Sequence, residues 1–217
     1  MQTYREALAA IELDSSNAGV VCEKLEDTQL QADCLIAGAE SMADLHPTEA
    51  ADLCDRISPT MNQGVSRDEC LFQVAERSKE PARCSKAGRF ADPCRMHLWG
   101  SHVPSLQGST WKEKETAAQS SIGHYGLQDT DTRPWIALYR WLLSHQHPLS
   151  RHECATAIHT DACMEAGVSL VQDRLNRLTD LQQLPCTPDE PLPSLLQVTD
   201  DENLSKMITK RQEIVCR

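Results

Sequence analysis

The sequence predicts an all-α protein of stacked helical hairpins, each closed by a disulfide. Apolar residues recur every three or four positions along almost the whole chain, which is the helical period. No run alternates apolar and polar residues as a half-buried strand would. Ten cysteines fall along the 217 residues as five consecutive close pairs. Together these observations predict an α-solenoid-like repeat that carries a helical insertion.

Four of the five cysteine pairs share one local pattern. The first cysteine ends a helical segment, a polar connector follows, and the second opens another helical segment just after an Asp. The four are Cys22/Cys34, Cys54/Cys70, Cys84/Cys94 and Cys154/Cys163, and the fifth, differently spaced pair is Cys186/Cys216. Because short loops cost least entropy to close, we predict disulfides between neighbours. Metal thiolates and free structural thiols stay open as alternatives, although no CxxC spacing occurs.

The sequence around the second cysteine of these four pairs repeats. The strings are QADCLIAGA, SRDECLFQVA, FADPCRMHL and HTDACMEAG, and the first cysteines 22, 54 and 84 lie 32 and 30 residues apart. A period near thirty built from two helices is typical of an α-solenoid. We expect the Asp of each string in a first helical turn, where it complements the helix dipole.

Local signals divide the N-terminal segment, residues 1–103, into helices. A first helix is expected over residues 4–13, and 14–16 form a break with a capping residue. Pro47 suits the first position of a later helix. Residues 62–64 form a turn, and Ser66 and Glu69 have capping-box spacing.

The second segment, residues 104–148, has no cysteine and holds three of the four Trp. We expect Thr110 and Glu113 to form a capping box and Pro134 to begin a helix. Because Trp and Tyr are enriched at binding surfaces, we select Trp99, Trp111, Trp135, Tyr139 and Trp141 as a candidate surface. Trp99 and Trp111 are expected to be partly exposed. The alternative is that the rings fill the core, which the helical spacing on the segment after Pro134 favours.

The third segment, residues 149–217, holds the longest regular pattern. Apolar residues after Asp161 follow 4-3-4-3 spacing, which predicts a seam for packing on another helix: Met164, Val168, Val171, Leu175 and Leu178. A proline-rich stretch, 185–193, precedes a final helix over about 200–215, which Cys186/Cys216 would tie back. We expect the three segments to form one compact unit.

Charge and cysteine content bear on compartment and partners. A net charge of −11 repels phosphate backbones and disfavours nucleic acid as a partner. Ten cysteines favour an extracytoplasmic location: periplasm, cell surface or medium. The sequence beginning Met1-Gln2-Thr3-Tyr4 has no signal-peptide pattern, which we interpret as a mature form given a start Met. No apolar run is long enough to span a membrane, and a lipid anchor stays open.

Motifs for chemistry are sparse. The chain has no GxSxG, HExxH or Gly-rich phosphate loop, and we predict no cofactor. His145, His147 and His152 are metal-ligand candidates, although a histidine at a helix end more often caps it. We therefore expect a non-enzymatic extracytoplasmic binding or scaffold protein with a protein partner, such as an accessory subunit of an envelope assembly. The alternatives are a histidine-centred metal-binding protein or enzyme, and a small-molecule carrier with a pocket under Trp135 and Trp141.

Overall fold

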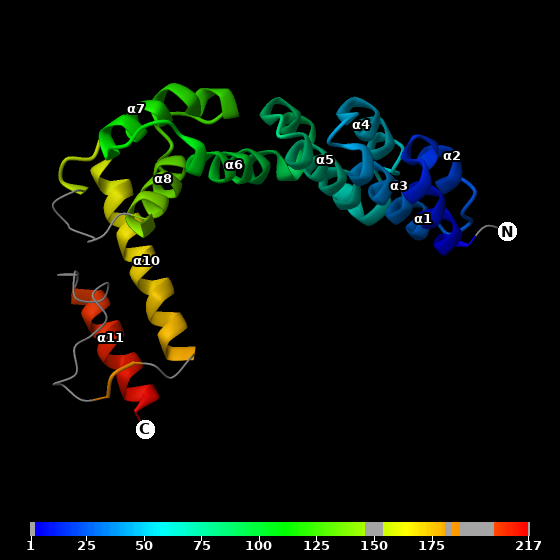
Figure 1. The fold of residues 1–217 in the computed structure, drawn as a ribbon. Coiled ribbons are helices and arrows are strands. Elements are labelled where there is room, and N and C mark those ends of the chain that lie inside the picture. The colour runs from blue at the N-terminus through cyan, green and yellow to red at the C-terminus, as the bar shows by residue number, and fades with distance from the viewer. Residues whose placement is uncertain (1–2, 146–153, 181–183, 187–201, 217) are drawn as a thin grey trace. The chain divides into compact units, whose positions relative to one another are not determined.

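The computed structural model describes residues 3–145, 154–180, 184–186 and 202–216, which are mostly helical and include no strand (Figure 1). The all-α prediction is confirmed, while the solenoid-like stacking stays a prediction. Contacts group the chain into two compact units: unit 1 (Met1–Ser101 and Gly123–Leu127) and unit 2 (His102–Ile122 and Gln128–Arg217). This division follows contacts, whereas the predicted segments 1–103, 104–148 and 149–217 follow the cysteine pattern.

Each unit is built from several helices. Unit 1 contains α1 (Tyr4–Leu13), η1 (Ser15–Asn17), α2 (Ala18–Cys22), α3 (Thr28–Met42), α4 (Pro47–Asp55), η2 (Met61–Gly64), α5 (Val65–Ser78), η3 (Pro81–Lys86), η4 (Gly88–Phe90) and, at its boundary, α6 (Ala91–His102). Unit 2 contains η5 (Val103–Ser105), α7 (Trp111–Ser121), α8 (Thr132–His145), α10 (Thr160–Asp180) and α11 (Glu202–Val215), and the short η6 (Ile122–Tyr125) falls at the division. The η elements are short 3₁₀ helices of three to six residues.

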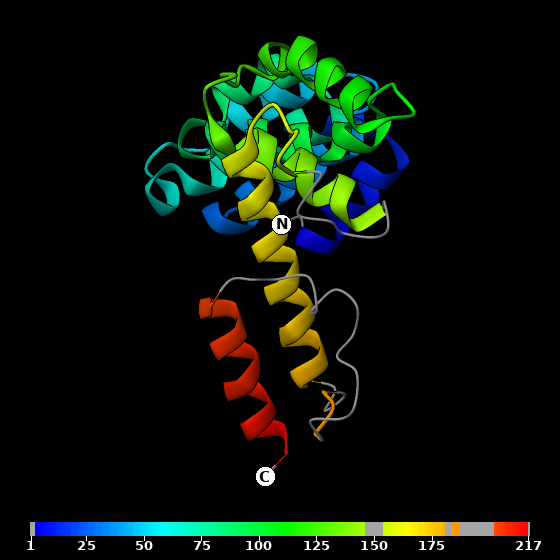
Figure 2. The same cartoon turned by 90° about the vertical axis from the view of Figure 1, so that its left-hand side faces the viewer.

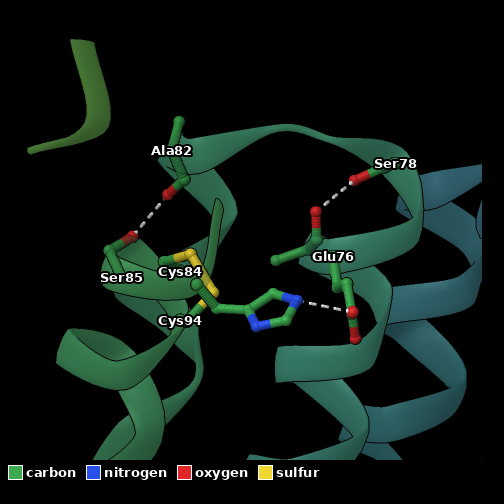
Figure 3. The surroundings of a disulfide bond; sticks show 8 residues. Glu76, Ser78, Ala82, Cys84, Ser85 and Cys94 are labelled. Carbon is green, nitrogen blue, oxygen red and sulfur yellow. Dashed lines mark hydrogen bonds and ion pairs between the residues drawn. A yellow bond between two sulfur atoms is a disulfide. The ribbon is translucent and has the colours of Figure 1, made fainter. Parts of the chain in front are cut away.

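All ten cysteines form disulfides, in the five neighbour pairs that short loop closure favours. The paired Cα atoms lie 5.4–5.6 Å apart, within the usual range. Figure 3 shows Cys84–Cys94, which ties η3 to α6. The His97 ring of α6 donates to the Glu76 carboxylate of α5 at 2.7 Å, so a polar contact also joins these two helices. Five disulfides indicate a protein that lies outside the reducing cytoplasm.

Cys186–Cys216 differs from the other four disulfides in exposure. Both of its cysteines are exposed, whereas the other eight are at most 4% exposed. We predict that a dithiol reductant under native conditions opens Cys186–Cys216 first, because exchange requires access to sulfur. The loss of loop closure would destabilise the docking of α11 by roughly 3.5 kcal/mol in the chain-entropy model. Timed alkylation with peptide mass mapping measures the order, and early labelling of a buried cysteine would contradict it.

The core of unit 1 is rich in alanine, which allows its helices to approach closely. Helix α3 packs against α1, α2 and α4. At their junction a Cβ on Gly38 would come 2.5 Å from the Cβ of Ala18, and one on Gly19 would come 2.2 Å from the Arg56 guanidinium. Gly38 is therefore required by space, because the Ala18 Cβ cannot move away, whereas the flexible end of the Arg56 side chain could shift to admit a side chain at position 19.

Helix starts agree with the sequence signals in part. The capping box of Thr110 and Glu113 is confirmed. The one expected at Ser66 is wrong: α5 begins one residue earlier, at Val65, and Ser66 is buried inside its first turn. The cause is the turn over residues 62–64, whose φ angles of 45°, 54° and 81° are all left-handed. The last of these residues, Gly64, is the N-cap, so Val65 is already the first residue of the helix.

The Asp before the second cysteine lies in the first helical turn at three of the four repeats, at Asp68, Asp92 and Asp161. The expectation is wrong for Asp33, because α3 begins at Thr28 and is capped by another residue, Asp27. The Asp68 carboxylate also accepts a hydrogen bond from the backbone N–H of Arg89 at 3.1 Å. It therefore links α5 to η4 in addition to its place near the helix start.

In unit 2, α11 lies beside the C-terminal half of α10 and runs parallel to it (Figure 2). Val171, Leu175 and Leu178 of α10 pack with Leu184 and with Ile208 of α11. The predicted seam is thus buried in its second half. Met164 and Val168, in its first half, are only partly buried. Among the described residues no helix has the length and apolarity to cross a membrane.

Candidate functional site

The aromatic residues predicted to form a surface divide into two groups. Trp99, Trp135 and Tyr139 are fully buried, so the prediction of a binding surface is corrected for these three. Trp99 was also expected to be partly exposed, and that expectation is wrong. Trp111 and Trp141 are partly buried, as expected for Trp111. The physical reason on α8 is periodicity, because residues 135, 138, 139 and 142 share one helical face and all four are buried.

A buried carboxylate organises the centre of unit 2. Glu115 on α7 is 3% exposed, and its Oε1 accepts hydrogen bonds from the Tyr139 hydroxyl at 2.7 Å and the Ile158 N–H at 3.0 Å. The His159 N–H donates to the same hydroxyl at 3.2 Å. These bonds join α7, α8 and the loop that Cys154–Cys163 closes. We call Glu115, Tyr139, Ile158 and His159 the anchor network.

The aromatic rings around the anchor network pack on one another. The His159 ring lies 4.2 Å from the Trp135 ring, centroid to centroid, and the Tyr139 ring lies 6.3 Å from it. The Trp135 indole N–H donates to the backbone carbonyl of Asp129 at 2.9 Å. Protein side chains therefore contact Trp135 where the small-molecule carrier hypothesis requires a ligand.

The hydroxyl of Tyr139 is held in its protonated form. Burial, and then the hydrogen bond to Glu115, raise the pKa of Tyr139 far above its ordinary value. A phenol with a raised pKa stays protonated near neutral pH, so the Tyr139 hydroxyl is not a general base there. The anchor network therefore has a structural role: it holds α7, α8 and the Cys154–Cys163 loop together.

The raised tyrosine pKa predicts an alkaline titration. Because the folded pKa lies above the unfolded one, near 10, the stability it reflects is complete below pH 10 and is lost as the pH rises further. Burial also raises the pKa of Tyr125. We expect absorbance at about pH 11 to show less tyrosinate in the native protein than in the unfolded chain. Tyr139→Phe should remove most of that difference, and equal tyrosinate in both states would contradict the burial.

Among the described residues, Lys114 and Glu115 are charged and buried, and sequence reasoning missed both. Lys114 is 9% exposed, and its ammonium donates to the Leu106 carbonyl at 2.6 Å and lies 4.9 Å from the Trp141 ring centroid. The available signal was periodicity: positions 111, 114, 115, 118 and 122 form the inward stripe of this segment. Charged residues inside an apolar stripe mark a buried polar contact.

The metal hypothesis falls partly outside the described residues, since His147 and His152 are not among them. His145 is exposed at the end of α8, stacks on Trp141 at 4.6 Å and lies 2.8 Å from the carbonyl of that residue. Through this contact the His145 side chain caps a carbonyl in the last turn of α8, as a histidine at a helix end commonly does. In the part of the chain that the structure describes, no three His, Cys, Asp or Glu side chains gather as metal ligands would.

Unit 1 presents a surface groove where α2, α3 and α4 meet. Its volume is about 230 Å³, and its lining comprises Ser16, Gly19, Val20, Met42, Glu49, Asp52, Leu53 and Arg56. Met42 and Leu53 are buried and form an apolar base, whereas Val20 is 58% exposed. We call this feature the α2–α4 groove. Figure 1 shows the three helices side by side in unit 1.

The charges of the α2–α4 groove are unevenly paired. The Arg56 guanidinium forms an ion pair with Glu23 at 3.1 Å. Glu49 and Asp52 are exposed, and among the described residues neither carboxylate has a hydrogen bond or ion pair. The sequence could not reveal this groove, because its lining comes from three helices separated along the chain.

The fold and these sites define a class: a disulfide-bonded, all-α protein outside the cytoplasm with a small acidic groove. A scan against protein-family models and searches of curated proteins and of solved structures found no match to this chain.

Proposed function

We propose that the protein is a non-enzymatic binding or scaffold protein of the periplasm, cell surface or medium, and that the α2–α4 groove holds a protein partner. An accessory role in an envelope assembly is consistent with this proposal. The observation that carries it is that exposed Val20 and two carboxylates, Glu49 and Asp52, which have no partner among the described residues, meet at one groove.

The disulfides support this proposal by fixing the groove before a partner arrives. Cys22–Cys34 ties α2 to α3, and Cys54–Cys70 ties α4 to α5. All four cysteines are at most 1% exposed, so the cross-links lie within the packed core. A surface that loses little freedom on binding pays a smaller entropic cost, which favours recognition.

The test is crosslinking at one residue followed by titration. A photoreactive residue replaces Val20, or Ile214 as a control of matched exposure at 58% and 56%. In the native compartment we expect one specific product from position 20, identified by mass spectrometry. The purified partner should then bind Val20→Asp about tenfold or more weakly, and Ile214→Asp unchanged, as for loss of a central apolar contact. Unchanged affinity for Val20→Asp would refute the groove as the binding site.

The alternatives drawn from sequence lack a comparable observation in the described residues. The metal-binding hypothesis depends on histidines that do not gather there, and the carrier hypothesis depends on rings that protein side chains contact.

A further inference from the structure

We infer that the α2–α4 groove recognises a cationic side chain, Arg or Lys, that stands beside an apolar residue on the partner protein. The inference rests on the proposed function and specifies the chemistry of the partner at that site. It follows from three properties of the groove: its size, its charge and its apolar base.

The size of the groove matches a side chain better than a free ligand. Small-molecule sites occupy about 300–1,000 Å³ and bury most of their ligand. The α2–α4 groove measures about 230 Å³ and lies at the surface, where Val20, Glu49 and Asp52 are exposed. One long side chain entering from a partner surface fits that space, whereas a drug-sized molecule would remain largely in water.

The charge of the groove selects a cation. Glu49 and Asp52 stand three positions apart on α4, so their carboxylates lie on one helix face. Arg56 also lines the groove, and its guanidinium forms an ion pair with Glu23 at 3.1 Å. Within the described part of the chain, the Glu49 and Asp52 carboxylates therefore have no counter-charge, and the net charge of −11 also draws cations toward the protein. A guanidinium, with its fork of donors, suits two carboxylates best.

The apolar base of the groove provides a surface for the methylene stem of the partner's Arg or Lys. Arg and Lys bury their methylene stems on apolar surface while the charged head stays near water or a counter-ion. Met42 and Leu53 form that base, and Val20 extends it outward. Because Val20 is 58% exposed, it has area left to contact an apolar neighbour of the cation. Carboxylates beside apolar surface fit this pair better than a hydrated metal ion, which needs oxygen ligands on several sides.

The first experiment compares two probes on the full-length protein. Two fluorescein-labelled, alanine-based helical peptides carry leucines at the same positions, with arginines in one and glutamates in the other. By anisotropy at low salt we expect the arginine peptide to bind at least about tenfold more tightly, and added salt to reduce the difference. Equal binding of the two peptides, or no binding of the arginine peptide at millimolar concentration, would overturn the inference.

The second experiment locates the effect. Glu49→Lys/Asp52→Lys reverses the two groove charges, and Glu26→Lys/Glu69→Lys makes the same change at exposed positions outside the groove lining. We expect the groove variant to lose about tenfold in affinity for the arginine peptide and the control less than about twofold. Circular dichroism checks that both variants fold. An equal loss in both variants would show that only net charge matters, and the inference would be wrong.

The outcomes separate this inference from the proposed function. If a crosslinked partner is sensitive to Val20→Asp but indifferent to reversal of Glu49 and Asp52, the groove is a docking site and its preference for cations is refuted. If the arginine peptide depends on Glu49 and Asp52 while no partner depends on Val20, the preference stands and the proposed function fails.

Discussion

Trp135→Ala is expected to lower the free energy of unfolding of unit 2 by about 3–5 kcal/mol, the range for truncating a buried large aromatic side chain. Trp135 is fully buried, its ring packs on Tyr139 and His159, and its N–H bonds to the Asp129 carbonyl. The substitution removes all of these contacts and leaves a cavity, since helices held by packing and a disulfide cannot close in fully. Urea unfolding followed by far-UV circular dichroism measures the loss.

Trp141→Ala is the matched control for that prediction. Trp141 lies on the same helix but is only partly buried, with its ring stacked on exposed His145. We expect it to cost clearly less than Trp135→Ala, because part of its surface already meets water. Equal losses for the two variants would mean that burial does not decide the energetics of α8.

Glu115→Ala should cost about 1–3 kcal/mol, because it leaves the buried Tyr139 hydroxyl without its acceptor and also removes the acceptor of a part-buried backbone N–H. The donors are the Tyr139 hydroxyl and the Ile158 N–H. Glu115→Gln retains a carbonyl oxygen that can accept from them, and it should lose less. Denaturant unfolding measures both variants.

Two further variants isolate the anchor network. Lys112→Ala changes an exposed residue of α7 and should alter stability by less than about 0.5 kcal/mol. Glu115→Ala combined with Tyr139→Phe should cost less than the sum of the single changes, because the second change removes one of the orphaned donors. Additive losses would argue that Glu115 and Tyr139 do not act as a pair.

These two predictions concern how unit 2 is held together, and they separate it from the proposed binding site. The anchor network fixes the Cys154–Cys163 loop through its backbone, at Ile158 and His159. The α2–α4 groove lies in unit 1 and has no part in that network. Variants of Glu115 or Trp135 therefore test stability, and variants of Val20, Glu49 or Asp52 test recognition.

Local features of the molecule followed from the sequence. The helical period places α1 over the expected residues 4–13, and Thr110 and Glu113 form the capping box that their spacing indicates. The five disulfides join neighbouring cysteines, because each closes a loop between consecutive segments. Such features depend on residues close together in the chain, where geometry leaves few choices.

The tertiary structure alone decided the candidate sites. Periodicity marked Trp135 and Tyr139 as one helix face, but only packing between helices showed that this face is core rather than docking surface. Glu115 is known as an acceptor only because a loop 43 positions further along the chain folds onto it. The α2–α4 groove likewise exists only when three separated helices meet. Periodicity and capping act within a few residues, whereas burial and charge pairing depend on which distant segments become neighbours.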